Sequence, residues 1–177
     1  QVDKIYALPG NGGFEGDAEC VDIGAKDIEG IVRFAAEYAI DYAVVAPDDP
    51  LVLGAVDALE AAGIPCFGPV AKAAIIEGSK VFSKNLMKKY GIPTAAYETF
   101  DNMESALSWL DTASAPIVVK ADGLALGKGV LIANRIAEAK EAVKEMMEDK
   151  KFGDAGNRMV AESFLTGREV SILAFVD

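Results

Sequence analysis

The sequence predicts an α/β protein with two parts that are organised differently. Up to residue 76, short apolar strands alternate with helical segments, and this alternation is typical of a parallel sheet flanked by helices. Between residues 116 and 133, a strand leads through a glycine-rich loop directly into another strand. Hydrophobic residues make up 51% of the 177 positions, which is enough for a sizeable buried core.

The first part contains three expected strands and two expected helices. The strands are Lys4–Leu8, Tyr42–Ala46 and Cys66–Phe67. One helix is expected over Ile28–Ala39. A second should have Asp49 as its N-cap and Pro50 at its first position, where a proline is tolerated. It should end at Gly63, because glycine favours helix ends and the Ile-Pro pair that follows prevents continuation.

The second part contains three further expected helices and five expected strands. The helices are Lys80–Tyr90, Asn102–Leu110 and Ile136–Glu148, and the strands are Ala96–Phe100, Pro116–Lys120, Val130–Ala133, Met159–Glu162 and Val170–Val176. Phe82, Leu86 and Tyr90 recur on one face of the first of these helices, which predicts a packed apolar face. Asp101 and Glu104 have the spacing of a capping box at the start of the next one.

The composition excludes several classes of function. The chain has no histidine, so it holds neither a Ser-His-Asp triad nor a zinc site built on histidine. A net charge of −11 argues against nucleic acid or an anionic membrane as a partner. No apolar run reaches the ~18 residues that span a bilayer. Cys20 and Cys66 stand alone, and we expect no signal peptide, so reduced thiols in a cytoplasmic protein are expected.

The loop after the Lys120 strand is a candidate for binding an anion. Gly123, Gly127 and Gly129 let backbone N–H groups approach a phosphate closely, and Lys128 stands among them. The spacing fits neither a Walker A loop nor a dinucleotide-binding fingerprint, so we interpret the loop as a phosphate-covering loop of another kind. Lys120 itself has two open interpretations: it binds phosphate, or it reaches solvent from the end of its strand.

For most of the other candidate residues, the sequence alone favours an ordinary explanation. Lys80 begins a helix, where N–H groups favour an anion, but it could be one more surface lysine. Glu162 and Glu169 bracket a turn that could contact an adenine edge and ribose hydroxyls, or could face solvent. Asp48 is expected to serve a helix start, and a substrate contact is the less favoured alternative. The loop Pro9–Gly13 could hold a sugar phosphate or be a plain turn.

Taken together, these segments resemble the phosphoribosylamine–glycine ligases, the glycinamide ribonucleotide synthetase family of the ATP-grasp superfamily. The resemblance covers essentially the whole chain and is most specific in the order and spacing of PGNGG, GSK-x-F-x-K and KADGLA-x-GKGV. It rests on ALPGNGG (7–13), PDDPLVLGAVDALEAAGIPCFGP (47–69), EGSKVFSKNLMKKYGIPTA (77–95), PIVVKADGLALGKGV (116–130), FGDAG (152–156) and AESFLTGREVSILAFVD (161–177).

The resemblance implies a truncated N-terminal parallel α/β domain followed by an incomplete ATP-grasp module. The small B subdomain of that module is α+β and folds over the nucleotide. The implied boundaries are 1–76 for the N-terminal, substrate-side domain, 77–97 for the start of the A subdomain, 98–167 for the B subdomain and 168–177 for the return to the A subdomain. We therefore expect the chain to be a fragment of a longer polypeptide that does not turn over by itself.

The resemblance also implies a reaction and its small-molecule partners. Enzymes of this family join glycine to phosphoribosylamine in purine biosynthesis, using ATP and Mg²⁺, through a glycyl phosphate intermediate. Positioning and charge neutralisation supply most of the catalysis in such a phosphoryl transfer. No metal ligand is assigned in this chain, because the Mg²⁺-binding carboxylates are expected after Asp177.

Site residues follow from the resemblance by matching positions. Lys80 and Lys120 would hold ATP phosphates, the loop with Lys128 would cover them, and Glu169 would bind the ribose. The residues implied to contact ATP are Lys80, Lys120, Asp122, Gly123, Gly127, Lys128, Gly129, Glu162, Ser163, Phe164, Leu165 and Glu169, of which Glu162 to Leu165 would read adenine through the backbone. Those implied on the substrate side are Pro9, Gly10, Asn11, Gly12, Gly13, Asp48 and Pro50.

Two alternatives stay open at this stage. The chain could belong to another ATP-grasp ligase that joins a different carboxylate and amine, or it could be a nucleotide-binding module without chemistry. The family commonly has Gly-Pro-Glu where this chain has Ala46-Pro47-Asp48, followed by a second acid, Asp49. A shorter carboxylate at this position reaches less far toward a substrate.

Overall fold

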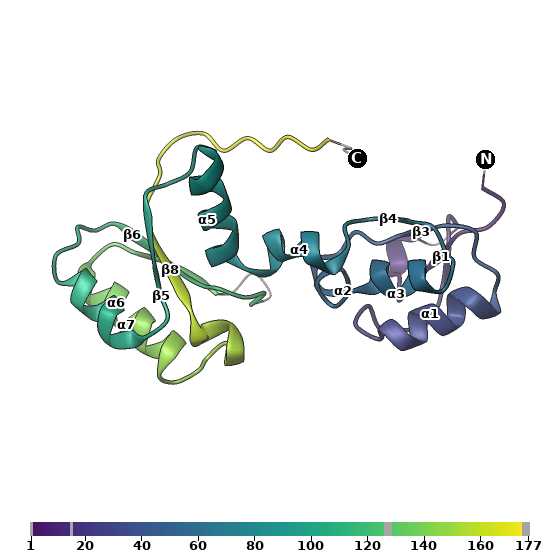
Figure 1. Ribbon diagram of the computed structural model, residues 1–177, viewed down its shortest axis with the longest axis horizontal. Helices are drawn as coiled ribbons and strands as arrows, with labels where there is room; N and C mark the ends of the chain where they lie inside the picture. Colours follow the sequence, from purple (N-terminus) through teal and green to yellow (C-terminus); the bar gives the residue numbers. More distant parts are fainter. Residues whose placement is uncertain (1, 15, 126–128, 175–177) are drawn as a thin grey trace. The chain divides into compact units, whose positions relative to one another are not determined.

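The computed structural model describes residues 2–14, 16–125 and 129–174, and the chain divides into two compact units, 1–83 and 84–177 (Figure 1). Each unit has a hydrophobic core of its own. The predicted α/β class with two differently organised parts is confirmed, because the sheets of the first unit are parallel and the sheet of the second is antiparallel.

The first unit contains two separate parallel pairs of short strands. β1 (Tyr6–Ala7) pairs with β2 (Glu19–Cys20), and β3 (Ala43–Val44) pairs with β4 (Cys66–Phe67). The parallel pairing follows the predicted alternation. However, β1 and β3 are shorter than the expected five-residue strands, and β2 was not expected from the sequence.

Four helices accompany these strands, together with one 3₁₀ turn. They are α1 (Ile28–Glu37), α2 (Asp48–Val52), α3 (Ala55–Ala61) and α4 (Ala71–Gly78), and the turn is η1 (Gly12–Phe14). The Asp27 side chain caps α1 by accepting a hydrogen bond from the Gly30 N–H at 2.9 Å. The buried core residues come from all four of these helices and the segment after α3: Ala35, Leu51, Val56, Leu59, Ile64 and Ala74.

The single helix expected between Asp49 and Gly63 is two helices in the structure. Asp48 is the first residue of α2, so Asp49 is not its N-cap and Pro50 lies inside the first turn. A proline is tolerated there because the first N–H groups of a helix have no intrahelical partner. The helices separate at Gly54, whose φ of 85° is a left-handed conformation that glycine adopts without strain.

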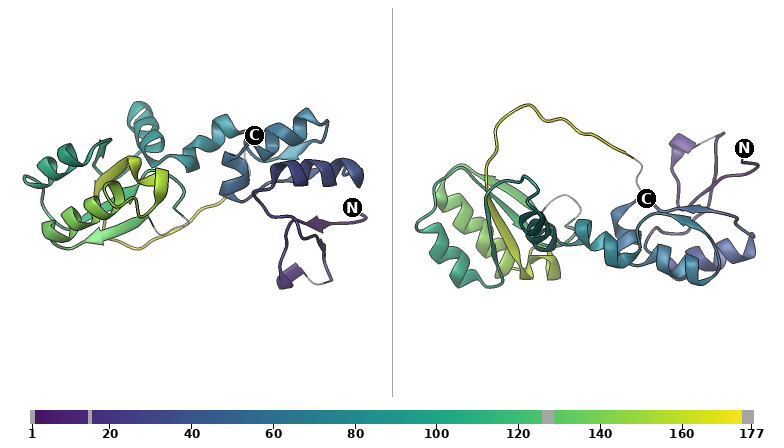
Figure 2. Two further views of the ribbon diagram at one scale, coloured as in Figure 1. Left: turned by 90° about the horizontal axis from the view of Figure 1, so that it is seen from below. Right: turned by 45° about the horizontal axis from the view of Figure 1, so that its top comes forward.

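The second unit is built on a four-stranded antiparallel sheet. Its strands are β5 (Tyr97–Phe100), β6 (Ile117–Ala121), β7 (Val130–Ala133) and β8 (Met159–Ser163), in the spatial order β5-β8-β6-β7. All four were expected close to these bounds. Lys120 is the penultimate residue of β6 rather than its last. β8, the last strand among the described residues, lies between β5 and β6 (Figures 1 and 2).

Two helices cover one face of this sheet. They are α6 (Met103–Leu110) and α7 (Ile136–Met147), which pack against each other and against the strands (Figure 2). A short 3₁₀ segment, η2 (Gly153–Asn157), precedes β8. The core between helices and sheet includes Leu110, Val119, Val143, Met159 and Ala161. Alternate residues of β6 and β8 therefore point toward the helices, and the residues between them point to the opposite face.

Helix α5 (Lys80–Tyr90) has the predicted bounds but not the predicted packing, and it crosses the boundary between the two units. None of its residues is buried, and Phe82 and Tyr90 are exposed. The predicted capping box at Asp101 is also wrong. The residue that caps α6 is Asn102, whose Oδ1 accepts a hydrogen bond from the Ser105 N–H at 2.8 Å.

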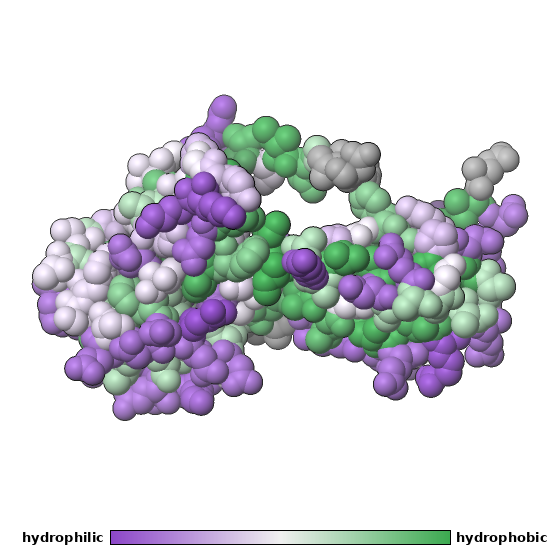
Figure 3. All heavy atoms as spheres, in the orientation of Figure 1, coloured by the Kyte–Doolittle hydropathy of each residue, from purple (hydrophilic) through white to green (hydrophobic). Residues whose placement is uncertain are grey.

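The strand predicted at Val170–Val176 does not form within residues 170–174, the part of it that the structure describes. This segment is extended and apolar, and Ile172 and Leu173 are each 91% exposed (Figure 3). No described residue pairs with it, and a strand exists only where a neighbour accepts its backbone hydrogen bonds. None of the helices in the described residues is long and apolar enough to cross a membrane.

Candidate functional site

The register of the antiparallel sheet places Lys120 and Glu162 on the same face. Glu162 lies opposite Val118 of β6 and opposite Tyr97 of β5. Lys120 is two residues beyond Val118, so its side chain projects on the same side as that of Glu162 and within diagonal reach. Helices α6 and α7 cover the opposite face of the sheet, which carries the hydrophobic core. The face with Lys120 and Glu162 is not covered by these helices and carries charged side chains.

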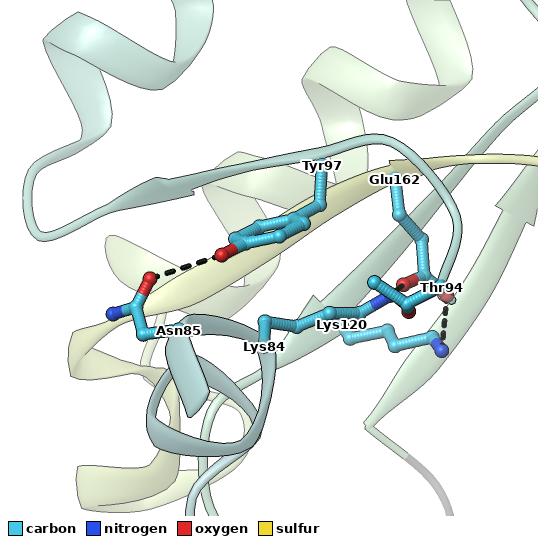
Figure 4. Close-up of polar contacts among 6 residues, drawn as sticks. All are labelled: Lys84, Asn85, Thr94, Tyr97, Lys120 and Glu162. Atoms are coloured by element: carbon cyan, nitrogen blue, oxygen red, sulfur yellow. Dashed lines mark hydrogen bonds and ion pairs between the residues drawn. The ribbon is translucent and has the colours of Figure 1, made fainter. Parts of the chain in front are cut away.

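Glu162 is a buried carboxylate between two lysines. It is 7% exposed, its Oε1 forms an ion pair with Lys120 Nζ, and its Oε2 forms one with Lys84 Nζ (Figure 4). Burial raises the pKa of the Glu162 carboxyl, but the Lys120 and Lys84 ammonium groups outweigh burial and hold this pKa below its ordinary value. Two cations around one anion leave this cluster with a net positive charge.

Lys84 reaches the cluster from helix α5 and has further partners. Its Nζ donates a hydrogen bond to Thr94 Oγ1 at 2.6 Å and lies 5.4 Å from the centroid of the Tyr97 ring. The Tyr97 hydroxyl in turn donates to Asn85 Oδ1 at 3.1 Å (Figure 4). Sequence reasoning did not assign Lys84 to the site, although Lys84 is the last residue of the GSK-x-F-x-K motif and lies one helical turn after Lys80.

Asp122 is held inside the second unit, beside the glycine loop. It is 5% exposed, and its carboxylate forms an ion pair with Arg158 Nη2 at 2.6 Å. Its N–H lies 3.0 Å from the carbonyl oxygens of both Ala155 and Arg158. These contacts fix the start of the loop, so they support a structural role for Asp122, and its predicted contact with ATP stays a prediction.

The glycines that bound the loop are required by close packing. A Cβ on Gly123 would lie 2.8 Å from the Ala155 Cβ, and one on Gly129 would lie 2.6 Å from the Ala125 Cβ. The Gly129 carbonyl accepts a hydrogen bond from the Ala121 N–H at 2.8 Å. Gly127 and Lys128, which the sequence also assigns to this loop, lie outside the described residues.

The segment predicted to contact adenine leaves the sheet after Ser163. The Ser163 N–H donates to the Ala96 carbonyl at 2.9 Å, so it is already used within the fold. Phe164 and Leu165 are exposed, and no backbone partner is found for either of them among the described residues. Glu169 is exposed as well. In this segment, the backbone N–H and C=O groups of Phe164 and Leu165 are therefore the ones that can still form hydrogen bonds with a ligand.

The residues predicted on the substrate side lie in the first unit. Asn11 Oδ1 accepts a hydrogen bond from the Gly13 N–H at 2.8 Å, and Gly10 has a φ of 72°. A Cβ at Gly10 would lie 2.5 Å from Cys20 Sγ, so a larger residue does not fit. Pro9 and Gly12 belong to the same loop; Pro9 precedes the turn and Gly12 begins η1. The Phe14 N–H also donates to the Asn11 carbonyl at 3.1 Å, so this loop is a hydrogen-bonded turn.

The remaining predicted positions of the first unit are at helix starts. Asp48 begins α2 and is exposed, whereas Pro50 is buried within that helix. Lys80 begins α5, directly after Ser79, whose Oγ accepts a hydrogen bond from the Phe82 N–H at 3.1 Å. One of the helix-start donors that favoured an anion near Lys80 therefore already has a partner within the chain.

An apolar hollow of about 420 Å³ also lies in the first unit. Its lining includes Ile31, Phe34, Tyr42, Val44, Val45 and Leu59. Few polar groups converge on it, so its chemistry differs from that of a phosphate or sugar site. The hollow does not coincide with the Pro9–Gly13 loop that the sequence singles out.

The antiparallel sheet, its glycine loop and the paired lysines define a class of protein that the family comparison identifies as ATP-grasp. Residues 78–177 match the phosphoribosylglycinamide synthetase ATP-grasp (A) domain, and residues 1–77 match the N domain of the same synthetase. The chain belongs to the phosphoribosylglycinamide synthetase family, as the sequence motifs predicted.

Relatives of known identity agree with this assignment. The phosphoribosylamine–glycine ligase of Allochromatium vinosum is 51% identical over 100% of this chain and 42% of that protein. The ligase of Vibrio cholerae is 49% identical with the same coverage. The chain therefore spans less than half the length of the curated relatives that it matches.

Solved structures share the fold. The crystal structure of phosphoribosylamine–glycine ligase from Thermotoga maritima matches with a TM-score of 0.74 and 29% identity, over 93% of this chain and 39% of that one. N5-carboxyaminoimidazole ribonucleotide synthetase from Thermus thermophilus matches with a TM-score of 0.66 over 92% of this chain and 41% of that one. At 22% identity, this second likeness shows the fold alone.

Proposed function

We propose that the chain is the N-terminal domain and part of the ATP-grasp module of an enzyme that joins glycine to phosphoribosylamine with ATP. The observation that carries the proposal is the identity of about half of all residues, along the whole chain, to proteins named phosphoribosylamine–glycine ligase. In this proposal residues 1–76 form the substrate-side domain, 77–97 and 168–177 belong to the A subdomain, and 98–167 form the B subdomain.

The proposed reaction has two chemical steps, of which the first consumes ATP. A carboxylate oxygen of glycine attacks the γ-phosphorus, and the bond from that phosphorus to the β,γ-bridging oxygen breaks to release ADP. The amine of phosphoribosylamine then attacks the carbonyl carbon of the glycyl phosphate. The amide bond forms, inorganic phosphate leaves, and the amine loses a proton to solvent or to a base.

The chain's own contribution to this reaction is positive charge held on a rigid sheet. Lys120 lies at the base of the glycine loop and would contact the phosphates, with Lys80 and Lys128 proposed as additional phosphate ligands. A cation near a phosphoryl group that develops charge stabilises the transition state without moving. Phe164 and Leu165 would offer backbone groups to adenine, and Glu169 would bind ribose hydroxyls.

Mg²⁺ would neutralise phosphate charge when ATP is bound. The side chains described around Glu162 are cations paired with one anion, which suits phosphate rather than a metal ion. Metal ligands are therefore proposed to come from residues after Asp177 in the polypeptide. The proposed partners are small molecules, and the two free cysteines, Cys20 and Cys66, suit the reducing cytoplasm in which we place the enzyme.

The test is release of ADP from MgATP by the complete polypeptide that contains this chain. Glycine and phosphoribosylamine are each omitted in turn. Turnover that requires both substrates supports the proposal. Turnover with another carboxylate or amine would retain the ATP-grasp chemistry but overturn the substrates, and ATP binding without any turnover would indicate a nucleotide-binding module instead. The 177-residue chain alone should bind ATP without turning it over.

A further inference from the structure

The two lysines that share Glu162 are not equivalent. The Lys84 side chain is 12% exposed, donates to Thr94 Oγ1 at 2.6 Å and lies over the Tyr97 ring. The Lys120 side chain is 26% exposed and, among the described residues, contacts Glu162 alone. Three partners fix the ammonium group of Lys84, whereas Lys120 can leave the cluster by breaking one contact (Figure 4).

The departure of Lys120 depends on what remains around Glu162. A buried carboxylate that loses its only counter-ion is strongly destabilised, because neither water nor protein then compensates its charge. Here Lys84 remains bound to the carboxylate when Lys120 moves away. Glu162 therefore stays paired, and Lys120 can contact a phosphate without leaving an isolated buried charge behind.

The same arrangement limits competition between Glu162 and a bound phosphate. A carboxylate with a single lysine partner attracts that lysine with its full charge, and a phosphate must displace it. A carboxylate whose second oxygen already binds another ammonium attracts the first lysine less strongly. The hydrogen bond to Thr94 and the Tyr97 ring keep Lys84 available for this purpose.

We propose that Lys84 is a positioning residue: it neutralises Glu162 permanently, and thereby frees Lys120 to bind the phosphates of the nucleotide. This inference rests on the proposed function, since it concerns the same phosphate site. It assigns different tasks to the two lysines, with Lys120 in contact with phosphate and Lys84 acting on Lys120 through Glu162.

The test measures dissociation constants of ATP and of adenosine for the 177-residue chain by calorimetry in the presence of Mg²⁺. The dissociation constant of adenosine divided by that of ATP reports how much the phosphates contribute to binding. Changes in the contacts to adenine affect both constants and therefore cancel in this ratio. In Lys84→Met, the ratio should fall by about tenfold, the size of one charge-assisted contact. Lys88→Met, an exposed lysine one turn further along the same helix, is the matched control and should leave the ratio unchanged.

Glu162→Gln separates this role from a direct contact between Lys84 and phosphate. With a neutral side chain at 162, Lys120 no longer needs a second lysine to be released. The double variant Lys84→Met with Glu162→Gln should therefore regain the ratio of the unsubstituted chain. Lys84→Arg should also keep it, because the charge beside Glu162 remains.

Each outcome bears on the inference in a defined way. An unchanged ratio in Lys84→Met overturns it, and so does a double variant that is as weak as Lys84→Met. Should Lys84→Met fail to fold, Glu162→Gln alone decides: its ratio should equal or exceed that of the unsubstituted chain, and a lower ratio overturns the inference. If the unsubstituted chain binds adenosine and ATP equally, the proposed phosphate site itself is wrong.

Discussion

Lys120 is the side chain on which the proposed binding of phosphate should depend most. Lys120→Ala should weaken ATP binding at least tenfold, because it removes a charge-assisted contact. The fold should survive, since Glu162 keeps Lys84 as its counter-ion. Calorimetric titration with ATP, alongside thermal unfolding, checks both statements. Lys144→Ala, an exposed lysine on α7, is the control, and an ATP affinity unchanged by Lys120→Ala would contradict the assignment.

Protonation of Glu162 at acid pH should lower the stability of the second unit. The pKa of the Glu162 carboxyl in the folded protein is held below the ordinary value of 4.5 by the two lysines, so the folded state binds a proton less readily than the unfolded state. The stabilisation is complete above the unfolded pKa and is lost as the pH falls through the folded pKa.

Urea unfolding between about pH 7 and pH 3 measures this contribution. The loss of unfolding free energy across that range should be smaller for Glu162→Gln than for the unsubstituted chain. Glu141→Gln, an exposed acid on α7, serves as the control. Identical pH profiles for Glu162→Gln and the unsubstituted chain would show that the ion pairs do not stabilise the fold.

Sequence reasoning identified Lys120 and Glu162 but not the relation between them. Lys120 stood out because a glycine-rich loop follows its strand, and that signal is local in the chain. The ion pair between Lys120 and Glu162 forms because β8 lies beside β6 in the sheet. The ion pair between Lys84 and Glu162 depends on helix α5, which belongs to a third segment of the chain. No local pattern encodes which strands become neighbours, so the cluster could not be predicted.

At the level of the secondary-structure elements, the start of α6 offers a direct test of the corrected cap. Asn102→Ala should destabilise the second unit by about 1 kcal/mol, because the Ser105 N–H loses its acceptor at the helix start. Asp101→Ala, at the neighbouring position that the sequence favoured, should cost clearly less. Urea unfolding of both variants decides between the two caps, and an equal or larger loss in Asp101→Ala would favour the original prediction.

The elements were easier to locate than their packing. All four strands of the second unit were expected near their observed bounds, because apolar runs between turn residues are a strong signal. The break at Gly54 was missed, since a single glycine inside a helical pattern is often tolerated. The strand expected at Val170–Val176 had the right composition, but no described segment lies beside residues 170–174 to complete it.

For the molecule as a whole, the two separate cores predict two separable responses to mutation. Leu110→Ala should remove packing in the second unit and Leu59→Ala in the first, each costing about 2–5 kcal/mol of that unit's stability. Hydrogen exchange measured by mass spectrometry should show faster exchange in residues 84–174 for the first variant and in residues 2–83 for the second. Faster exchange throughout the chain in either variant would indicate a single cooperative unit.

The exposed apolar segment at residues 170–174 has a practical consequence for anyone handling this polypeptide. An extended backbone with unpaired N–H and C=O groups is a substrate for proteolytic nicking and a template on which another chain can add a β-strand. The exposed apolar side chains of Val170, Ile172 and Leu173 would further stabilise such pairing between chains. Storage at high concentration should therefore favour association through this segment, and a polar substitution at Ile172 should improve shelf life without disturbing either core.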